Sequence, residues 1–244
     1  MKTLVAAALL AAVAGSASAE LSGESAQFAG YININAVSGD TTYTDSPITT
    51  RATTQYTNTA SAANFGFSST DLNSTWGDDT YGVGTGGTLS GFQATIFNSG
   101  SSTGSLLTAT IAFSFYDANT LAPLGGFNGS VNFGTGLNKG FYTILTWSNL
   151  DSFGIVVPKD VMITQKVTAK TGLASRLGFV SLNPPTIGSS FDDFYANSTT
   201  VGAAGWYTVA SGPANPGYQL DVVPAPASLA LLGMGGLIAG RRRR

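Results

Sequence analysis

The chain contains neither cysteine nor histidine, and charged residues make up only 10% of it, against about 25% in a typical soluble protein. Without cysteine, neither disulfides nor thiolate metal sites can hold the fold together. Without histidine, the commonest general base and metal ligand is missing, and a Ser-His-Asp triad is impossible. The stability of the fold must therefore come from packing and from backbone hydrogen bonds.

Glycine and aromatic residues are abundant instead. The 244 residues include 31 Gly, 14 Phe, 9 Tyr and 3 Trp. Glycine, serine and threonine are poor residues for helix interiors, so this composition disfavours a helical body. The many large aromatic side chains and the low net charge also argue against disorder. A chain of this length can bury a substantial core.

The N-terminus, MKTLVAAALLAAVAGSASAE, has the pattern of a secretory signal peptide. Lys2 provides the positive start, residues 4–15 form the apolar region, and Ala17 and Ala19 fit the small-residue cleavage pattern. A permanent membrane anchor is disfavoured because the apolar stretch is short and ends in small residues. We therefore predict that residues 1–19 form a signal helix, recognised by the secretion machinery and removed by signal peptidase.

The C-terminus, VPAPASLALLGMGGLIAGRRRR, spans residues 223–244 and contains a second apolar run. At about 1.5 Å per residue, a helix over residues 227–240 covers roughly 21 Å, which is short of the roughly 30 Å hydrocarbon core. The terminal arginines can reach the headgroups and keep this end cytoplasmic; they are Arg241, Arg242, Arg243 and Arg244. These features predict a transmembrane sorting helix with a cytoplasmic stop, and the alternative is a permanent tail anchor.

Residues 223–244 resemble the PEP-CTERM sorting domain. The resemblance rests on Val223, Pro224, Ala225 and Pro226, on the glycine-containing apolar segment and on the terminal arginines, and Ala225 stands where the family motif has Glu. It implies processing at this motif by an exosortase-type enzyme of the membrane, in bacteria that make extracellular polysaccharide. It also implies that the membrane is occupied only transiently, before delivery to the cell surface or the medium.

The charge of the predicted mature body is negative. Between the two terminal signals lie six basic and thirteen acidic residues, which gives a net charge near −7. Nucleic-acid binders show the opposite sign, with clustered lysine and arginine. This class of function is therefore excluded, and an exported protein is favoured.

The body alternates apolar and polar residues with a period of two, which is typical of half-buried strands. The clearest runs are FAGYININAV (28–37), GFQATIFN (91–98), SLLTATIAFSFYD (105–117), GFYTILTWSNL (140–150) and VMITQKVT (161–168). Turn-forming residues separate them, as in WGDD and PLGG. Residues 20–222 are thus predicted to form a single jelly-roll-like β-sandwich of about ten strands. Residues 39–63 are the least patterned part, and TTQYTNT within them suits an edge strand with little apolar surface.

Two adjacent aspartate pairs are the candidates for metal or acid chemistry: Asp78 with Asp79, and Asp192 with Asp193. Neighbours on a strand point to opposite faces, so neither pair makes a catalytic dyad unless it lies in a turn. The favoured interpretation of Asp78 and Asp79 is a turn after Trp76 and Gly77. If the two loops meet, the four carboxylates could bind Ca²⁺, a hypothesis that calorimetry on the purified protein tests.

Sugar binding is a further candidate, because aromatic side chains lie beside glycine-rich turns. Trp76, Tyr81, Trp206 and Tyr207 have this position, although packing over a sheet edge is the commoner role of such residues. Trp147 lies within an alternating run and is predicted to be part of the core.

The sequence therefore predicts an exported, non-enzymatic protein of the cell surface or extracellular matrix, with a structural or adhesive role in or beneath a polysaccharide layer. The alternatives are a carbohydrate-binding module and a secreted aspartate-dependent hydrolase. The ligand and oligomeric state of the body do not follow from the sequence.

Overall fold

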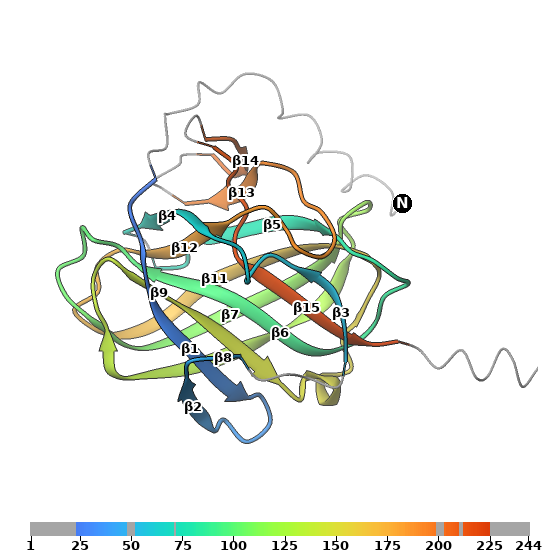
Figure 1. Cartoon of the computed structure of the whole chain (residues 1–244), viewed down its shortest axis with the longest axis horizontal. Coiled ribbons are helices and arrows are strands. Elements are labelled where there is room, and N and C mark those ends of the chain that lie inside the picture. The colour runs from blue at the N-terminus through green and yellow to red at the C-terminus, as the bar shows by residue number, and fades with distance from the viewer. Residues whose placement is uncertain (1–22, 48–51, 71, 199–202, 210–211, 225–244) are drawn as a thin grey trace, which may run out of the picture.

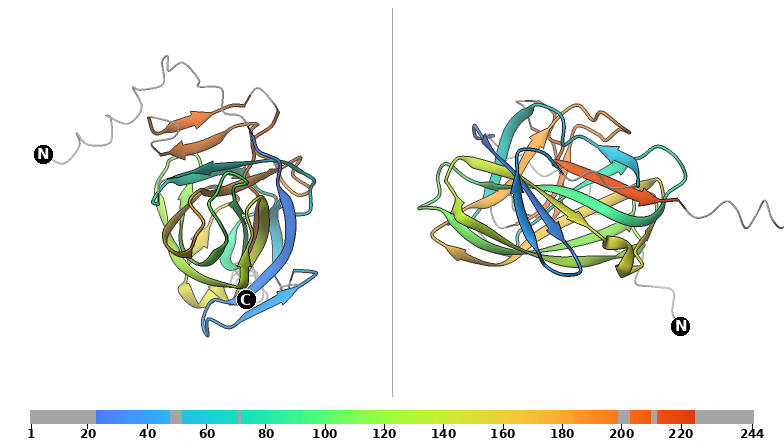
Figure 2. Two further views of the ribbon diagram at one scale, coloured as in Figure 1. Left: turned by 90° about the vertical axis from the view of Figure 1, so that its left-hand side faces the viewer. Right: turned by 60° about the horizontal axis from the view of Figure 1, so that its bottom comes forward.

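Two β-sheets packed face to face make up the molecule (Figures 1 and 2). The structure, a computed structural model, describes residues 23–47, 52–70, 72–198, 203–209 and 212–224. Within these residues one sheet has nine strands and the other has six, which confirms the predicted all-β, two-layer architecture. The predicted signal and sorting helices lie outside the described residues. Among the residues that are described, no helix is long and apolar enough to cross a membrane.

The nine-stranded sheet contains β1 (Gln27–Asn35), β2 (Thr41–Thr44), β3 (Thr53–Thr57), β4 (Ala63–Ser69), β6 (Gly87–Asn98), β9 (Phe141–Ser148), β10 (Val156–Val157), β12 (Leu177–Leu182) and β15 (Tyr218–Val223). The six-stranded sheet contains β5 (Thr75–Tyr81), β7 (Leu106–Asp117), β8 (Pro123–Leu137), β11 (Asp160–Gly172), β13 (Phe194–Asn197) and β14 (Gly205–Tyr207). A short 3₁₀ helix, η1 (Leu150–Phe153), follows β9.

The main path of each sheet ends in two edge strands. The main path of the larger sheet is β2-β1-β9-β6-β12-β4, and that of the smaller sheet is β14-β13-β5-β11-β7-β8. β1 runs parallel to β9, whereas the other strand pairs are antiparallel. β2 and β8 therefore end the two paths, and the site described below lies between them.

Aromatic side chains from both sheets fill the main core. Phe92 of β6 packs edge-on against Phe113 of β7, with ring centroids 4.9 Å apart, and stacks against Trp147 of β9 at 6.1 Å. All three are at most 2% exposed, which confirms the prediction for Trp147. Edge-to-face and stacked pairs of this kind stabilise a core by about 0.5–1.5 kcal/mol each beyond the area that they bury.

The five alternating runs correspond to β1, β6, β7, β9 and β11. The prediction of about ten strands was too low, because short strands such as β2, β10 and β14 carry too few residues to show a period of two. The predicted turn at PLGG was also wrong, since these residues begin the long strand β8.

The least patterned segment does contain strands, namely β2 and β3. Among the described strands, β3 pairs with β15 alone, as expected of an edge strand. Although the strand carries little apolar surface, Gln55 and Tyr56 are fully buried. Tyr56 belongs to the main core, so this strand contributes a bulky aromatic side chain to the interior.

Candidate functional site

Asp78 lies in the middle of strand β5, not in the predicted turn. β5 is hydrogen-bonded on both sides, to β11 and to β13, and this pairing overrides the local preference of Gly and Asp for turns. Asp78 points into the sandwich with 0% exposure, and neither carboxylate oxygen has a hydrogen-bond partner of good geometry. Asp79 points the other way, and its carboxylate accepts a hydrogen bond of 2.8 Å from the Tyr81 hydroxyl.

The second aspartate pair lies beside the first, as the calcium hypothesis required. Asp192 and Asp193 precede β13, the strand that pairs with β5, and their charges help to raise the pKa of Asp78. However, no group of three or more acidic side chains within the described residues is arranged to hold a metal ion. Asp78 and Asp79 lie on opposite faces of one strand, which separates the two carboxylates that the hypothesis combined.

Burial sets the protonation of this cluster. The loss of hydration raises the pKa of Asp78 well above its ordinary value, and repulsion from Asp79 and Asp193 adds to the effect. Burial, reinforced by the Asp78 charge, likewise raises the pKa of Tyr218 well above its ordinary value, and the Tyr218 hydroxyl also lacks a hydrogen-bond partner in the described structure. Asp78 and Tyr218 thus form a buried acid–tyrosine cluster that solvent does not reach.

The aromatic candidates for sugar binding divide into buried and exposed residues. Trp76 is only 4% exposed and packs between Phe179 and Phe194, at 5.5 and 6.1 Å, so its role is packing. Trp206, on the edge strand β14, is 42% exposed and touches Tyr195 edge-on at 5.9 Å. Tyr81 and Tyr207 are half-buried beside aromatic neighbours, namely Phe191 and Phe194.

The first residues of the predicted sorting motif adjoin the folded body directly. Val223 is the last residue of β15, pairs with Thr88 of β6 and is 48% exposed, and Pro224 follows it. β15 lies between β3 and β6 in the larger sheet (Figure 1), and the described residues end one position after it, at Pro224. The other predicted signal residues, Ala17, Ala19, Ala225, Pro226 and Arg241–Arg244, lie outside the described residues.

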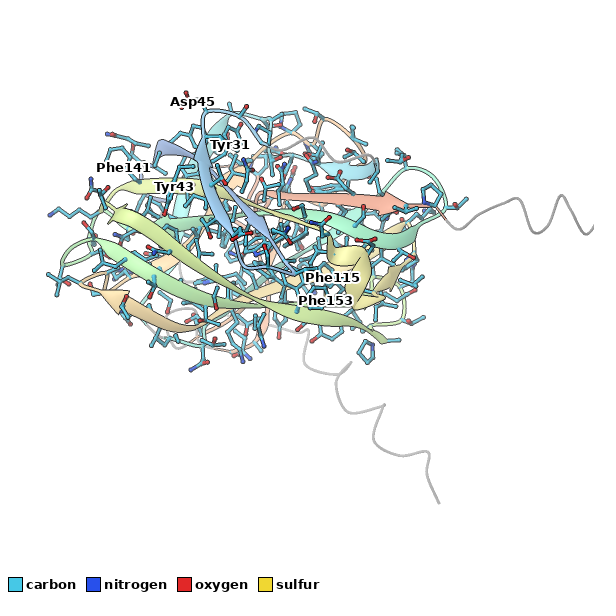
Figure 3. All side chains as sticks on the ribbon, turned by 90° about the horizontal axis from the view of Figure 1, so that it is seen from below. Tyr31, Tyr43, Asp45, Phe115, Phe141 and Phe153 are labelled. Atoms are coloured by element: carbon cyan, nitrogen blue, oxygen red, sulfur yellow. The ribbon has the colours of Figure 1, made fainter. Side chains whose placement is uncertain are left out.

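A groove of about 530 Å³, not predicted from the sequence, opens between the two sheets. One wall is the β1–β2 hairpin, with Tyr43 and Asp45, and the other is the end of β8, residues 133–137. Figure 3 shows Tyr31, Tyr43 and Asp45 near one another on the hairpin side, apart from Phe153 of η1. Tyr43 is 51% exposed, and Asp45 is also exposed.

Both walls of the groove contain a break in regular strand pairing. In β8 the register shift leaves residues 133–136 opposite the single β7 residue Leu107. In β1 the register against β9 shifts between Phe28 and Tyr31. Positive φ angles at Gly30 (113°), Gly134 (59°) and Gly136 (105°) make these bulges possible, because other residues rarely adopt such angles.

Side-chain hydrogen bonds fix the shape of the groove. The Tyr43 hydroxyl donates to the carbonyl oxygen of Asn132 on β8, which joins the edges of the two sheets. The Thr143 hydroxyl donates to the Gly30 carbonyl at 2.7 Å and holds the bulge of β1. The groove is therefore bounded by groups already held in position, as ligand sites commonly are.

Comparisons with known proteins do not identify a family. No family model matches the chain. No curated protein matches it either. A chain of the T13 IBDV viral particle is matched among solved structures with 14% sequence identity and a TM-score of 0.26. The match covers 78% of this chain and 43% of the viral chain, so this chain spans less than half of that protein's length.

Proposed function

We propose that this chain is an exported, non-enzymatic β-sandwich protein of the cell surface or extracellular matrix, processed through its C-terminal signal. The observation that carries the proposal is the position of Val223. The last strand ends at the first residue of the Val223–Pro226 motif, so cleavage there removes the tail without removing a strand. The alternating polar exterior and the scarcity of charge suit a structural or adhesive role in a polysaccharide layer.

We also propose the jelly-roll-like class, because β4, β5 and β6 alternate between the two sheets.

The intact mass of the protein recovered from its native cells and medium tests this proposal. We expect a mass that lacks residues 1–19 and ends at or near Pro224. Changing Pro224 and Pro226 to alanine should leave the tail attached and the protein in the membrane fraction. A wild-type mass that includes Arg241–Arg244 would show a permanent tail anchor and overturn processing by an exosortase-type enzyme.

Carbohydrate binding is the second candidate function, and the groove between β2 and β8 is the observation that favours it. Its lining combines aromatic rings, hydroxyl groups and one carboxylate. The earlier candidate Trp76 is buried and no longer supports this function, whereas Trp206 remains at the surface. The hydrolase alternative has no comparable support, because the Asp78 carboxyl is fully buried. Calcium binding stays a prediction, to be tested by calorimetry.

A further inference from the structure

We infer that the groove between the β1–β2 hairpin and the β8 bulge binds a neutral saccharide chain. The inference deepens the carbohydrate-binding function proposed above by naming the site and the class of ligand. The inference rests on the proposed function only for the source of the ligand, which is an extracellular polysaccharide. Binding in the groove can be tested separately from sorting.

Tyr43 supplies an aromatic face that is already oriented. Its hydroxyl is bonded to Asn132, and a Cβ atom built on Gly134 would lie 3.2 Å from the same hydroxyl oxygen, so the ring reaches across to β8. The residue remains half exposed. Sugar rings present apolar C–H faces that pack on aromatic surfaces, and a ring held in advance loses little conformational entropy on binding.

The polar groups around this ring match sugar hydroxyls. Asp45 and Thr135 are both exposed and line the groove. A carboxylate accepts strong, charge-assisted hydrogen bonds from hydroxyl donors, and a threonine hydroxyl can both donate and accept. A ligand with many hydroxyl groups and an apolar face satisfies both parts of the lining.

The charge of the groove disfavours anionic ligands. Among the described residues that line it, Asp45 is the only charged one. Uronic acid chains, phosphates and nucleotides would place an anion beside this carboxylate without a cationic partner, which is unfavourable. A neutral saccharide has no such conflict.

The bulge at residues 133–136 disfavours the other extended ligand, a peptide strand. Strand addition requires a regular row of backbone donors and acceptors along a sheet edge. Four residues of β8 face one residue of β7 here, and two of them have positive φ, so that row is interrupted. β-Bulges often occur beside functional sites, where they redirect side chains and backbone groups.

The test is a titration of the full chain with three tetrasaccharides, the neutral cellotetraose and xylotetraose and the acidic tetragalacturonate, and with the neutral polysaccharide of the producing cells. We expect at least one neutral probe to bind and tetragalacturonate to bind at least about tenfold more weakly. Tyr43→Ala should abolish binding. Asp45→Asn, at an exposed position that tolerates substitution, should weaken neutral binding by about tenfold, or about 1.4 kcal/mol, and narrow the discrimination against tetragalacturonate.

Matched controls come from η1, where Phe153 is 47% exposed and Asp151 is exposed. Phe153→Ala and Asp151→Asn should leave binding unchanged. If binding survives both groove substitutions but is lost in Trp206→Ala, the groove is not the binding site, although the protein still binds sugar. If no neutral probe binds, the inference that the groove binds a saccharide is wrong. This outcome does not depend on the intact mass, which tests only the sorting proposal. A retained tail together with groove binding would overturn the sorting proposal alone.

Discussion

Acid and tyrosine residues occur together in two regions of this sandwich, and their surroundings give them opposite properties. In the interior, Asp78 and Tyr218 are fully buried, and neither the carboxylate nor the hydroxyl has a hydrogen-bond partner of good geometry in the described structure. At the groove, the Tyr43 hydroxyl is bonded to Asn132, and Asp45 faces solvent. The first region is closed to solvent, whereas the second is accessible to a ligand. Residue types alone therefore do not identify a site, because burial decides what they can do.

Removing a tyrosine ring should separate the two regions most clearly. Tyr56 lies near Tyr218 in the buried region, where both Tyr56 and Asp78 act on the pKa of Tyr218. Tyr56→Ala should lower the free energy of unfolding by about 3–5 kcal/mol, because a fully buried aromatic side chain leaves a cavity. Tyr43→Ala should lower it by no more than about 1.5 kcal/mol, since half of the side chain is exposed and chiefly one hydrogen bond is lost. Urea unfolding measures both values, and equal losses would contradict the division into an interior and an open region.

The next largest effect concerns the buried carboxyl. Asp78→Asn should stabilise the protein at neutral pH by about 0.5–2 kcal/mol, because asparagine keeps the shape and cannot ionise. Burial raises the pKa of Asp78 in the folded state. As the pH rises above the ordinary carboxyl pKa, the unfolded chain therefore releases this proton first and folding loses stability. Below that pKa both states hold the proton and the loss disappears.

Urea unfolding at a series of pH values measures this difference. Wild type and Asp78→Asn should have similar stability in acid and diverge as the pH rises. Asp79 and Asp193 also have raised pKa values, so the variant should keep a shallower pH dependence. The exposed control Asp45→Asn should change stability by less than about 0.5 kcal/mol. A variant that is less stable than wild type at neutral pH would show that the Asp78 carboxylate has a stabilising partner.

The sequence predicted the regular part of this fold well, because alternation is a local signal. β6, β7, β9 and β11 follow from it, and so does the burial of Trp147. Asp78 was placed wrongly because Gly77, Asp78 and Asp79 have the local chemistry of a turn, whereas their strand conformation depends on distant pairing with β11 and β13. Local propensity cannot show such pairing.

The groove was missed for a related reason. It arises where two bulges from distant segments, at Gly30 and at residues 133–136, lie at neighbouring sheet edges. The sequence held one usable signal, since glycine within an alternating run, as in FAGYI and NFGTG, often marks a bulge. That signal locates each bulge but not their proximity, which depends on the strand order of both sheets.

The smallest and sharpest comparison is the removal of one hydroxyl group in each region. Tyr218→Phe should leave stability unchanged or raise it by about 1 kcal/mol, because the lost hydroxyl is buried without a partner. Tyr43→Phe should lower stability by about 0.5–1.5 kcal/mol, since it removes the bond to the Asn132 carbonyl. The same chemical change is thus expected to lower stability only at Tyr43, and paired urea unfolding curves measure the difference. Destabilisation by Tyr218→Phe would show that an ordered water satisfies the hydroxyl, and the interior cluster would then be a hydrogen-bonded network rather than an unsatisfied one.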